Sequence, residues 1–82
     1  MSDPLESNLF RKFVVETARE FSKLRLPASR KKSAMVNAVA IYEPSTKDIA
    51  VTVEDGQIVY VSVSHPRLGF VEVTVPHLVP AA

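Results

Sequence analysis

The segment Ile49–Val75 reads IAVTVEDGQIVYVSVSHPRLGFVEVTV, and valine or isoleucine recurs at odd positions through most of it. Alternation with a period of two is typical of strands that bury one face. Turn-forming residues interrupt it at Glu54–Gly56 and Pro66–Gly69. The segment therefore predicts three antiparallel strands that share one apolar face. The valines on either side of the second turn share one face only if its loop has an odd number of residues, either 66–68 or 65–69.

The register of the first turn depends on its loop length. A two-residue loop of Asp55 and Gly56 would pair Val53 with Ile58 and turn the later valines to the opposite face. A three-residue loop, Glu54–Gly56, with the glycine in a left-handed bulge position keeps all the valines on one face. Hydrophobic consistency therefore predicts the three-residue loop.

The N-terminal residues have the pattern of one amphipathic helix over about residues 4–25. Pro4 suits the first helical position, and Pro27 is expected to end the helix a residue or two before itself. The helix is longer than a typical strand, so Leu5 and Leu9 are expected to overhang the sheet. A second subunit or the C-terminal tail would cover them. The apolar stripe comprises Phe10, Phe13, Val14, Thr17, Ala18, Phe21 and Leu24.

The alternation of side chains over residues 34–43 predicts a further strand. One face would carry Met35, Asn37, Val39 and Ile41, and the other Val36, Ala38, Ala40 and Tyr42. The predicted fold is α+β, with one N-terminal amphipathic helix packed on a four-stranded antiparallel meander (α-β-β-β-β). The chain would form a single domain over residues 1–82, with a basic linker at 26–33, the sheet at about 34–75 and an extended tail at 76–82.

Composition restricts the class of protein. The chain has 82 residues, of which 46% are hydrophobic and 23% charged, and no cysteine. These values are typical of one ordinary globular domain, which at this size has a thin core that oligomerisation would help to stabilise. The N-terminus lacks a signal-peptide pattern, and no stretch is apolar enough to span a membrane. We expect a cytoplasmic protein, since the lack of cysteine also suits that compartment.

The second face of the predicted sheet is the first candidate for a binding surface. It is built mainly from small residues and carries a single charge, Glu72. A solvated face would normally carry several lysines and glutamates. Its large residues are the candidate partner-binding residues Tyr42, Ile58, Tyr60 and Phe70. They suggest a homodimer or contact with another protein. The alternatives are a stacking platform for single-stranded nucleic acid, with the basic linker contacting its backbone, and a face that strand twist and the tail cover.

A basic segment supports a second hypothesis. Residues 11–32 hold eight Lys or Arg residues and two Glu, a local charge of +6. Such a segment can contact phosphate, and the candidate nucleic-acid-binding residues are Arg25, Arg30, Lys31 and Lys32. A solvated connector is the competing interpretation of so short a run.

The sequence offers little for an enzyme. Its two glycines cannot form a Gly-rich phosphate loop, and its histidines, His65 and His77, have no partners at metal-ligand spacing. We therefore predict no catalytic residue, cofactor or metal. The predicted function is a non-enzymatic protein-interaction module, homodimeric through the second face of its sheet and the overhanging helix end. The alternative is a nucleic-acid-binding protein that uses the basic helix end and linker.

Overall fold

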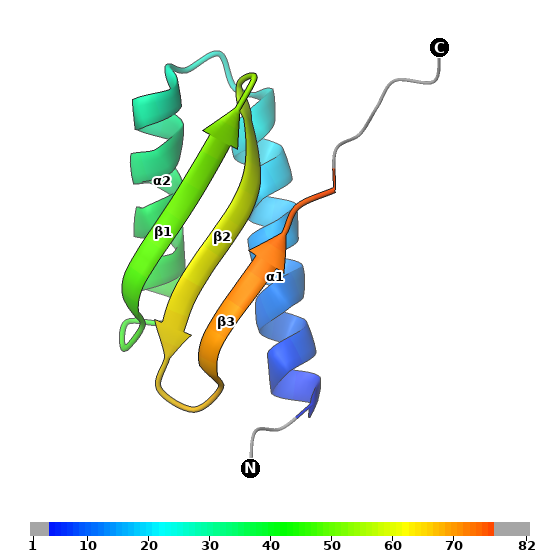
Figure 1. The fold of residues 1–82 in the computed structure, drawn as a ribbon, viewed down its shortest axis with the longest axis vertical. Coiled ribbons are helices and arrows are strands. Elements are labelled where there is room, and N and C mark those ends of the chain that lie inside the picture. Colours follow the sequence, from blue (N-terminus) through cyan, green and yellow to red (C-terminus); the bar gives the residue numbers. More distant parts are fainter. Residues whose placement is uncertain (1–3, 77–82) are drawn as a thin grey trace.

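The computed structural model describes residues 4–76, with side chains from residue 7 onward. The strands form one antiparallel sheet in the order β1-β2-β3, and both helices lie on the same face of it (Figure 1). The structure is α+β, but the predicted arrangement of one helix and four strands is wrong. The predicted tail lies, from residue 77, outside the described residues. The elements are α1 (Pro4–Lys23), α2 (Ala28–Tyr42), β1 (Lys47–Glu54), β2 (Gln57–His65) and β3 (Gly69–Thr74).

The segment that was predicted as a basic linker and a first strand forms helix α2. Met35 and Val39 are four residues apart, a spacing that puts two side chains on one face of either a helix or a strand. The discriminating positions are Asn37 and Ile41, which a strand would place beside them. Both are exposed, and Ile41 is 80% accessible. Alanines at four positions of this segment also favour a helix.

Prolines set the boundaries of α2. Pro27 is its N-cap, and the Pro27 carbonyl accepts hydrogen bonds from the backbone N–H groups of Arg30 and Lys31. After Tyr42 the chain becomes extended at Glu43, the residue before a proline, where an α-helical conformation is disfavoured. The short connections on either side hold α2 antiparallel to α1 and return the chain to the start of β1.

The first hairpin has the two-residue loop, so the predicted three-residue loop is wrong. Val53 pairs with Ile58, and the loop residues Asp55 and Gly56 have φ values of 51° and 76°. Positive φ at both central residues is what a type I′ turn requires. The valines still share a face because the register shifts between Thr52 and Val53, leaving Val59 as an extra, bulged residue in β2.

The second hairpin confirms the prediction of an odd loop. His65 pairs with Gly69 across the three residues 66–68, and Val63 then lies opposite Val71. Gly69 has a φ of 79°, in the left-handed region that glycine adopts without strain. A residue with a Cβ atom would be disfavoured there.

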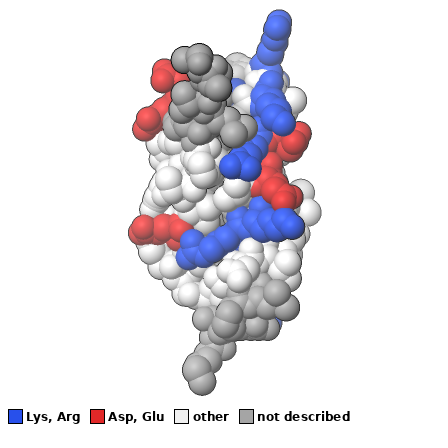
Figure 2. Space-filling view, turned by 90° about the vertical axis from the view of Figure 1, so that its right-hand side faces the viewer, with Lys and Arg blue, Asp and Glu red and all other residues white. Residues whose placement is uncertain are grey.

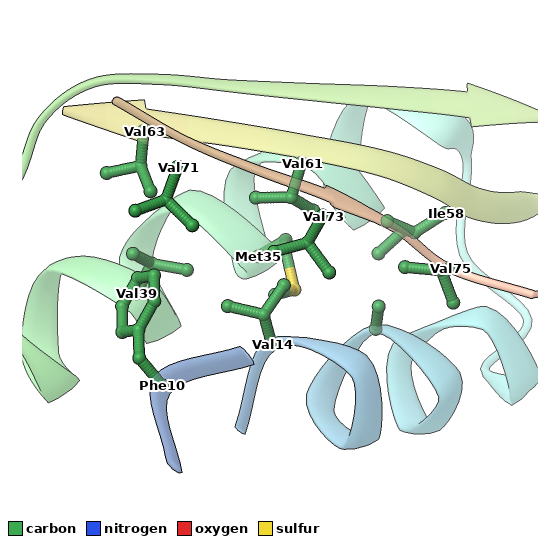
Figure 3. Close-up of a cluster of buried hydrophobic side chains, with 11 residues drawn as sticks. Phe10, Val14, Met35, Val39, Ile58, Val61, Val63, Val71, Val73 and Val75 are labelled. Carbon is green, nitrogen blue, oxygen red and sulfur yellow. The ribbon is translucent and has the colours of Figure 1, made fainter. Parts of the chain in front are cut away.

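The core lies between the sheet and the two helices, as Figure 3 shows. Helix α1 contributes residues four apart along one face, and α2 contributes Met35 and Val39 against the same valines. The predicted valine face is confirmed except at Val59, whose place is taken by Ile58. The buried cluster is Phe10, Val14, Ala18, Met35, Val39, Ile58, Val61, Val63, Val71, Val73 and Val75.

Candidate interaction surface

The outer face of the sheet is the face turned away from the helices. Residues paired directly across antiparallel strands share a face, so the register defines its rows. These rows, from β1 to β3, are Lys47, Ser64 and Phe70; Ala50, Ser62 and Glu72; Thr52, Tyr60 and Thr74; and, beside the hairpin turn, Glu54 and Gln57. No helix of the described residues 4–76 covers these rows (Figure 1).

The outer face is small, and three of its eleven residues are charged, where alternation alone predicts a single charge. Phe70 is 64% exposed, although it is among the largest apolar side chains in the protein. The charged residues are Lys47, Glu54 and Glu72. Strict alternation places Lys47 on the valine face, but a register shift between Lys47 and Ala50, where Asp48 has a φ of 53°, turns it outward. An exposed aromatic among small polar residues is typical of an interaction surface.

Two of the four predicted partner-binding residues lie on this face. Tyr60 and Phe70 are where the alternation placed them. Ile58 is not, since it is 1% exposed in the core, because the bulge at Val59 reverses the side-chain direction before it. Tyr42 lies at the end of α2, where its ring stacks on Phe13 with centroids 4.0 Å apart. The expected placement of Ile58 and Tyr42 on the second face is therefore wrong.

The predicted nucleic-acid-binding residues are divided between the surface and the interior. Arg25, Arg30 and Lys32 are exposed at the connection between the helices and in the first turn of α2. Lys31 is 4% exposed, and its Nζ donates hydrogen bonds to the Ser22 carbonyl, at 3.0 Å, and to the Gly56 carbonyl. Buried in this way, Lys31 joins the end of α1 to the β1–β2 turn and cannot contact a phosphate backbone.

The side of the molecule formed by α1 and β3 carries charges of both signs (Figure 2). On α1, Lys12 lies 3.9 Å from Glu16 and Lys23 lies 3.6 Å from Glu20. Arg11 crosses from α1 to the free edge of β3, where its Nη1 donates to the Glu72 carbonyl at 2.8 Å. Because the cations alternate with carboxylates, this side does not offer nucleic acid a continuous basic surface.

His65 has a structural environment that the sequence did not indicate. It is buried at the end of β2, with its ring edge-on to Phe10. Its Nδ1 accepts hydrogen bonds from the backbone N–H groups of Arg67 and Leu68, each at 3.1 Å. Nδ1 is therefore unprotonated, and Nε2 lies 3.6 Å from Glu43 Oε1, beyond hydrogen-bond length. Its role is to hold the β2–β3 turn. His77 lies outside the described residues.

A cavity of about 290 Å³ lies where the end of α1 meets the start of β2. Its walls include Arg19 and Lys23 of α1 and the side chains of Ile58 and Val75. This volume is at the lower limit of small-molecule sites. Within residues 4–76 no group of three or more His, Asp or Glu side chains is placed to hold a metal ion.

Comparison with known proteins gives no relative from which a function could be transferred. No protein-family model, no curated protein and no solved structure matches this chain. In the part of the chain that the structure describes, neither helix has the length and apolar character needed to cross a bilayer. Among the described residues, the outer face of the sheet, with its exposed Phe70, is the principal candidate for a functional surface.

Proposed function

We propose that this chain is a small non-enzymatic protein-interaction module that forms a homodimer through the outer face of its sheet. The observation that carries the proposal is the contrast between the two sides of the sheet. Two helices cover one side, while the other carries the exposed Phe70 and the half-buried Tyr60 among serine, threonine and alanine.

The size of the face sets the expected affinity. Three strands about 4.8 Å apart and about 24 Å long give a footprint of roughly 350 Å² for each subunit. This places the interface below the roughly 1,200 Å² of total buried area at which specific complexes become stable. The homodimer is therefore expected to be weak, with a Kd of about 10–500 μM. Leu9, 52% exposed on α1, remains a predicted additional contact.

The proposal assigns no catalytic role to Lys31 or to His65 Nδ1, because both are engaged with backbone groups. Lys31 bonds two backbone carbonyls, and His65 accepts two backbone N–H groups. A cytoplasmic location forms part of the same proposal and rests on the lack of cysteine. Nucleic-acid binding through Arg25, Arg30 and Lys32 has less support, since Lys31 is buried and carboxylates lie among the other cations.

Sedimentation equilibrium of the full chain over about 10–1,000 μM tests the homodimer. Replacing Phe70 by Lys should raise the dimer Kd at least about tenfold, because a charge would replace the aromatic ring within the contact. The matched control is Ile41→Lys, which makes the same kind of change at an exposed apolar residue of α2. It should leave the Kd within about twofold.

Two results would contradict this proposal. One is a wild-type chain that remains monomeric at about 1 mM, a concentration above the whole range of Kd expected from the footprint. The other is a dimer that Ile41→Lys weakens as much as Phe70→Lys does. Binding of an oligonucleotide with a steep salt dependence would instead favour the nucleic-acid hypothesis.

A further inference from the structure

The charges of the outer face are placed asymmetrically, and this constrains how two copies can meet. Lys47 is on β1 in the first row, Glu72 is on β3 in the second row, and Glu54 is on β1 in the last row. A homodimer contact uses the same residues on both subunits. The row and strand of each charged residue therefore determine which residue of the second subunit faces it. The inference below rests on the proposed function, because it specifies the geometry of that same dimer.

Two sheets packed face to face can be related by a two-fold axis parallel to the strands. This axis places β1 of one subunit over β3 of the partner and keeps the rows in step. Lys47 then faces Phe70 of the partner subunit and lies diagonally beside Glu72 of the partner subunit. The Lys47 stem can cover the exposed aromatic ring while its ammonium group reaches the carboxylate. The contact occurs twice in the dimer.

The other possibility is a two-fold axis across the strands, which places each strand over its own equivalent. Centred on the second row, this axis brings Glu72 against Glu72 of the partner subunit, two like charges in direct contact. Shifted by half a row, it pairs Lys47 with Glu54 of the partner subunit. Phe70 then lies over Pro76, the next outward position after Thr74 and beyond the end of β3. Either arrangement leaves a charge repelled or the exposed aromatic ring poorly covered.

We infer that the occupant of the outer face is a second copy of this chain, packed about a two-fold axis parallel to the strands, with Lys47 of each subunit between Phe70 and Glu72 of the other. Complementary charge and coverage of the 64%-exposed ring favour this axis. Arg11 supports the β3 edge from the other side, because it donates to the Glu72 carbonyl within the same subunit. The ammonium group of Lys47 would approach the carboxylate of Glu72 of the partner subunit across the outer face.

Charge reversal tests the predicted pair. Lys47→Glu and Glu72→Lys should each raise the dimer Kd by about tenfold, since every dimer gains two like-charge contacts. The double variant should return to within about threefold of the wild type. Lys32→Glu, the same change of charge on exposed α2, should leave the Kd within about twofold. Circular dichroism of each variant checks that the fold is intact.

A crosslinking experiment gives an independent measurement that does not change the charges. The chain has no cysteine, so Ser64→Cys introduces a single thiol on the outer face. With the axis parallel to the strands, the two thiols lie opposite each other, about 10 Å apart between the sheets. With the shifted axis across the strands, they are separated by about 20 Å along the strand direction. A short bis-maleimide should therefore join two subunits efficiently.

The possible outcomes separate this inference from the proposed function. If Glu54→Lys restores the affinity of Lys47→Glu and Glu72→Lys does not, the axis lies across the strands and the inference is wrong. A wild-type dimer that no charge reversal affects and that Ser64→Cys does not crosslink also overturns it, while the homodimer stands. A chain that is monomeric at about 1 mM overturns both.

Discussion

The same three strands build two faces with opposite roles. The inner face carries Val61, Val63, Val71 and Val73, each at most 4% exposed and part of one buried cluster with residues of both helices. The outer face carries threonine, serine and alanine at the neighbouring positions, with Phe70 in water. Burial of apolar area makes the inner face the main source of folding free energy. The outer face contributes little to that term and is free to serve a partner.

Neighbouring residues on β3 test this comparison most strongly. Val73→Asp should lower the free energy of unfolding by more than about 4 kcal/mol, because it places an unpaired carboxylate in the core. Thr74→Asp, one residue along on the exposed face, should change it by less than about 1 kcal/mol. Urea unfolding followed by circular dichroism measures both. If both substitutions lowered the free energy of unfolding by the same amount, the two faces would contribute equally to stability and the comparison would be wrong.

Lys31 allows the same contrast to be drawn between buried and exposed cations. Lys31→Met should destabilise the fold by about 2–3 kcal/mol, because the Ser22 and Gly56 carbonyls lose a charged donor. The adjacent exposed residue provides the control, and Lys32→Met should cost less than about 0.5 kcal/mol. Chemical denaturation of both variants checks the prediction. An unchanged stability of Lys31→Met would show that the two carbonyl contacts contribute nothing.

A substitution at His65, at the edge of the inner face, is expected to have the smallest effect on stability of the three. His65→Phe keeps an aromatic ring beside Phe10 but removes the Nδ1 acceptor, at a cost of about 1–2 kcal/mol. The Arg67 and Leu68 amides should then exchange with solvent faster than those of the β1–β2 turn. Hydrogen exchange by NMR distinguishes this local loss from general destabilisation. Uniformly faster exchange would contradict a role confined to the β2–β3 turn.

Regular patterns made part of the structure predictable. Phe10, Val14 and Ala18 recur at a spacing that indicates one buried helical stripe. Alternation identified the β2–β3 hairpin, and with it the outward positions of Tyr60 and Phe70. The candidate surface was thus found from periodicity alone where the strands are regular.

The predicted side-chain directions were wrong where a strand contains a bulge or a register shift. The bulge at Val59 turned Ile58 into the core, and the register shift at Asp48 turned Lys47 outward. Each adds one residue to a strand and so inverts the side chains before it. A bulge at Gly56 and a bulge at Val59 both keep Val61 and Val63 on the face of Val51, so hydrophobic consistency could not choose between them, whereas the Asp55-Gly56 pair favours the two-residue turn that is observed.

The sequence by itself determined the N-terminal helix, the valine face and the odd loop of the second hairpin, because each depends on a local period or turn residue. Only the tertiary structure decided that residues 28–42 are a helix and that Lys31 is buried. Met35 and Val39 satisfy both periods, and the choice depends on contacts with strands that follow later in the chain. Lys31 is buried because two carbonyls, from α1 and from the β1–β2 turn, converge on its ammonium group.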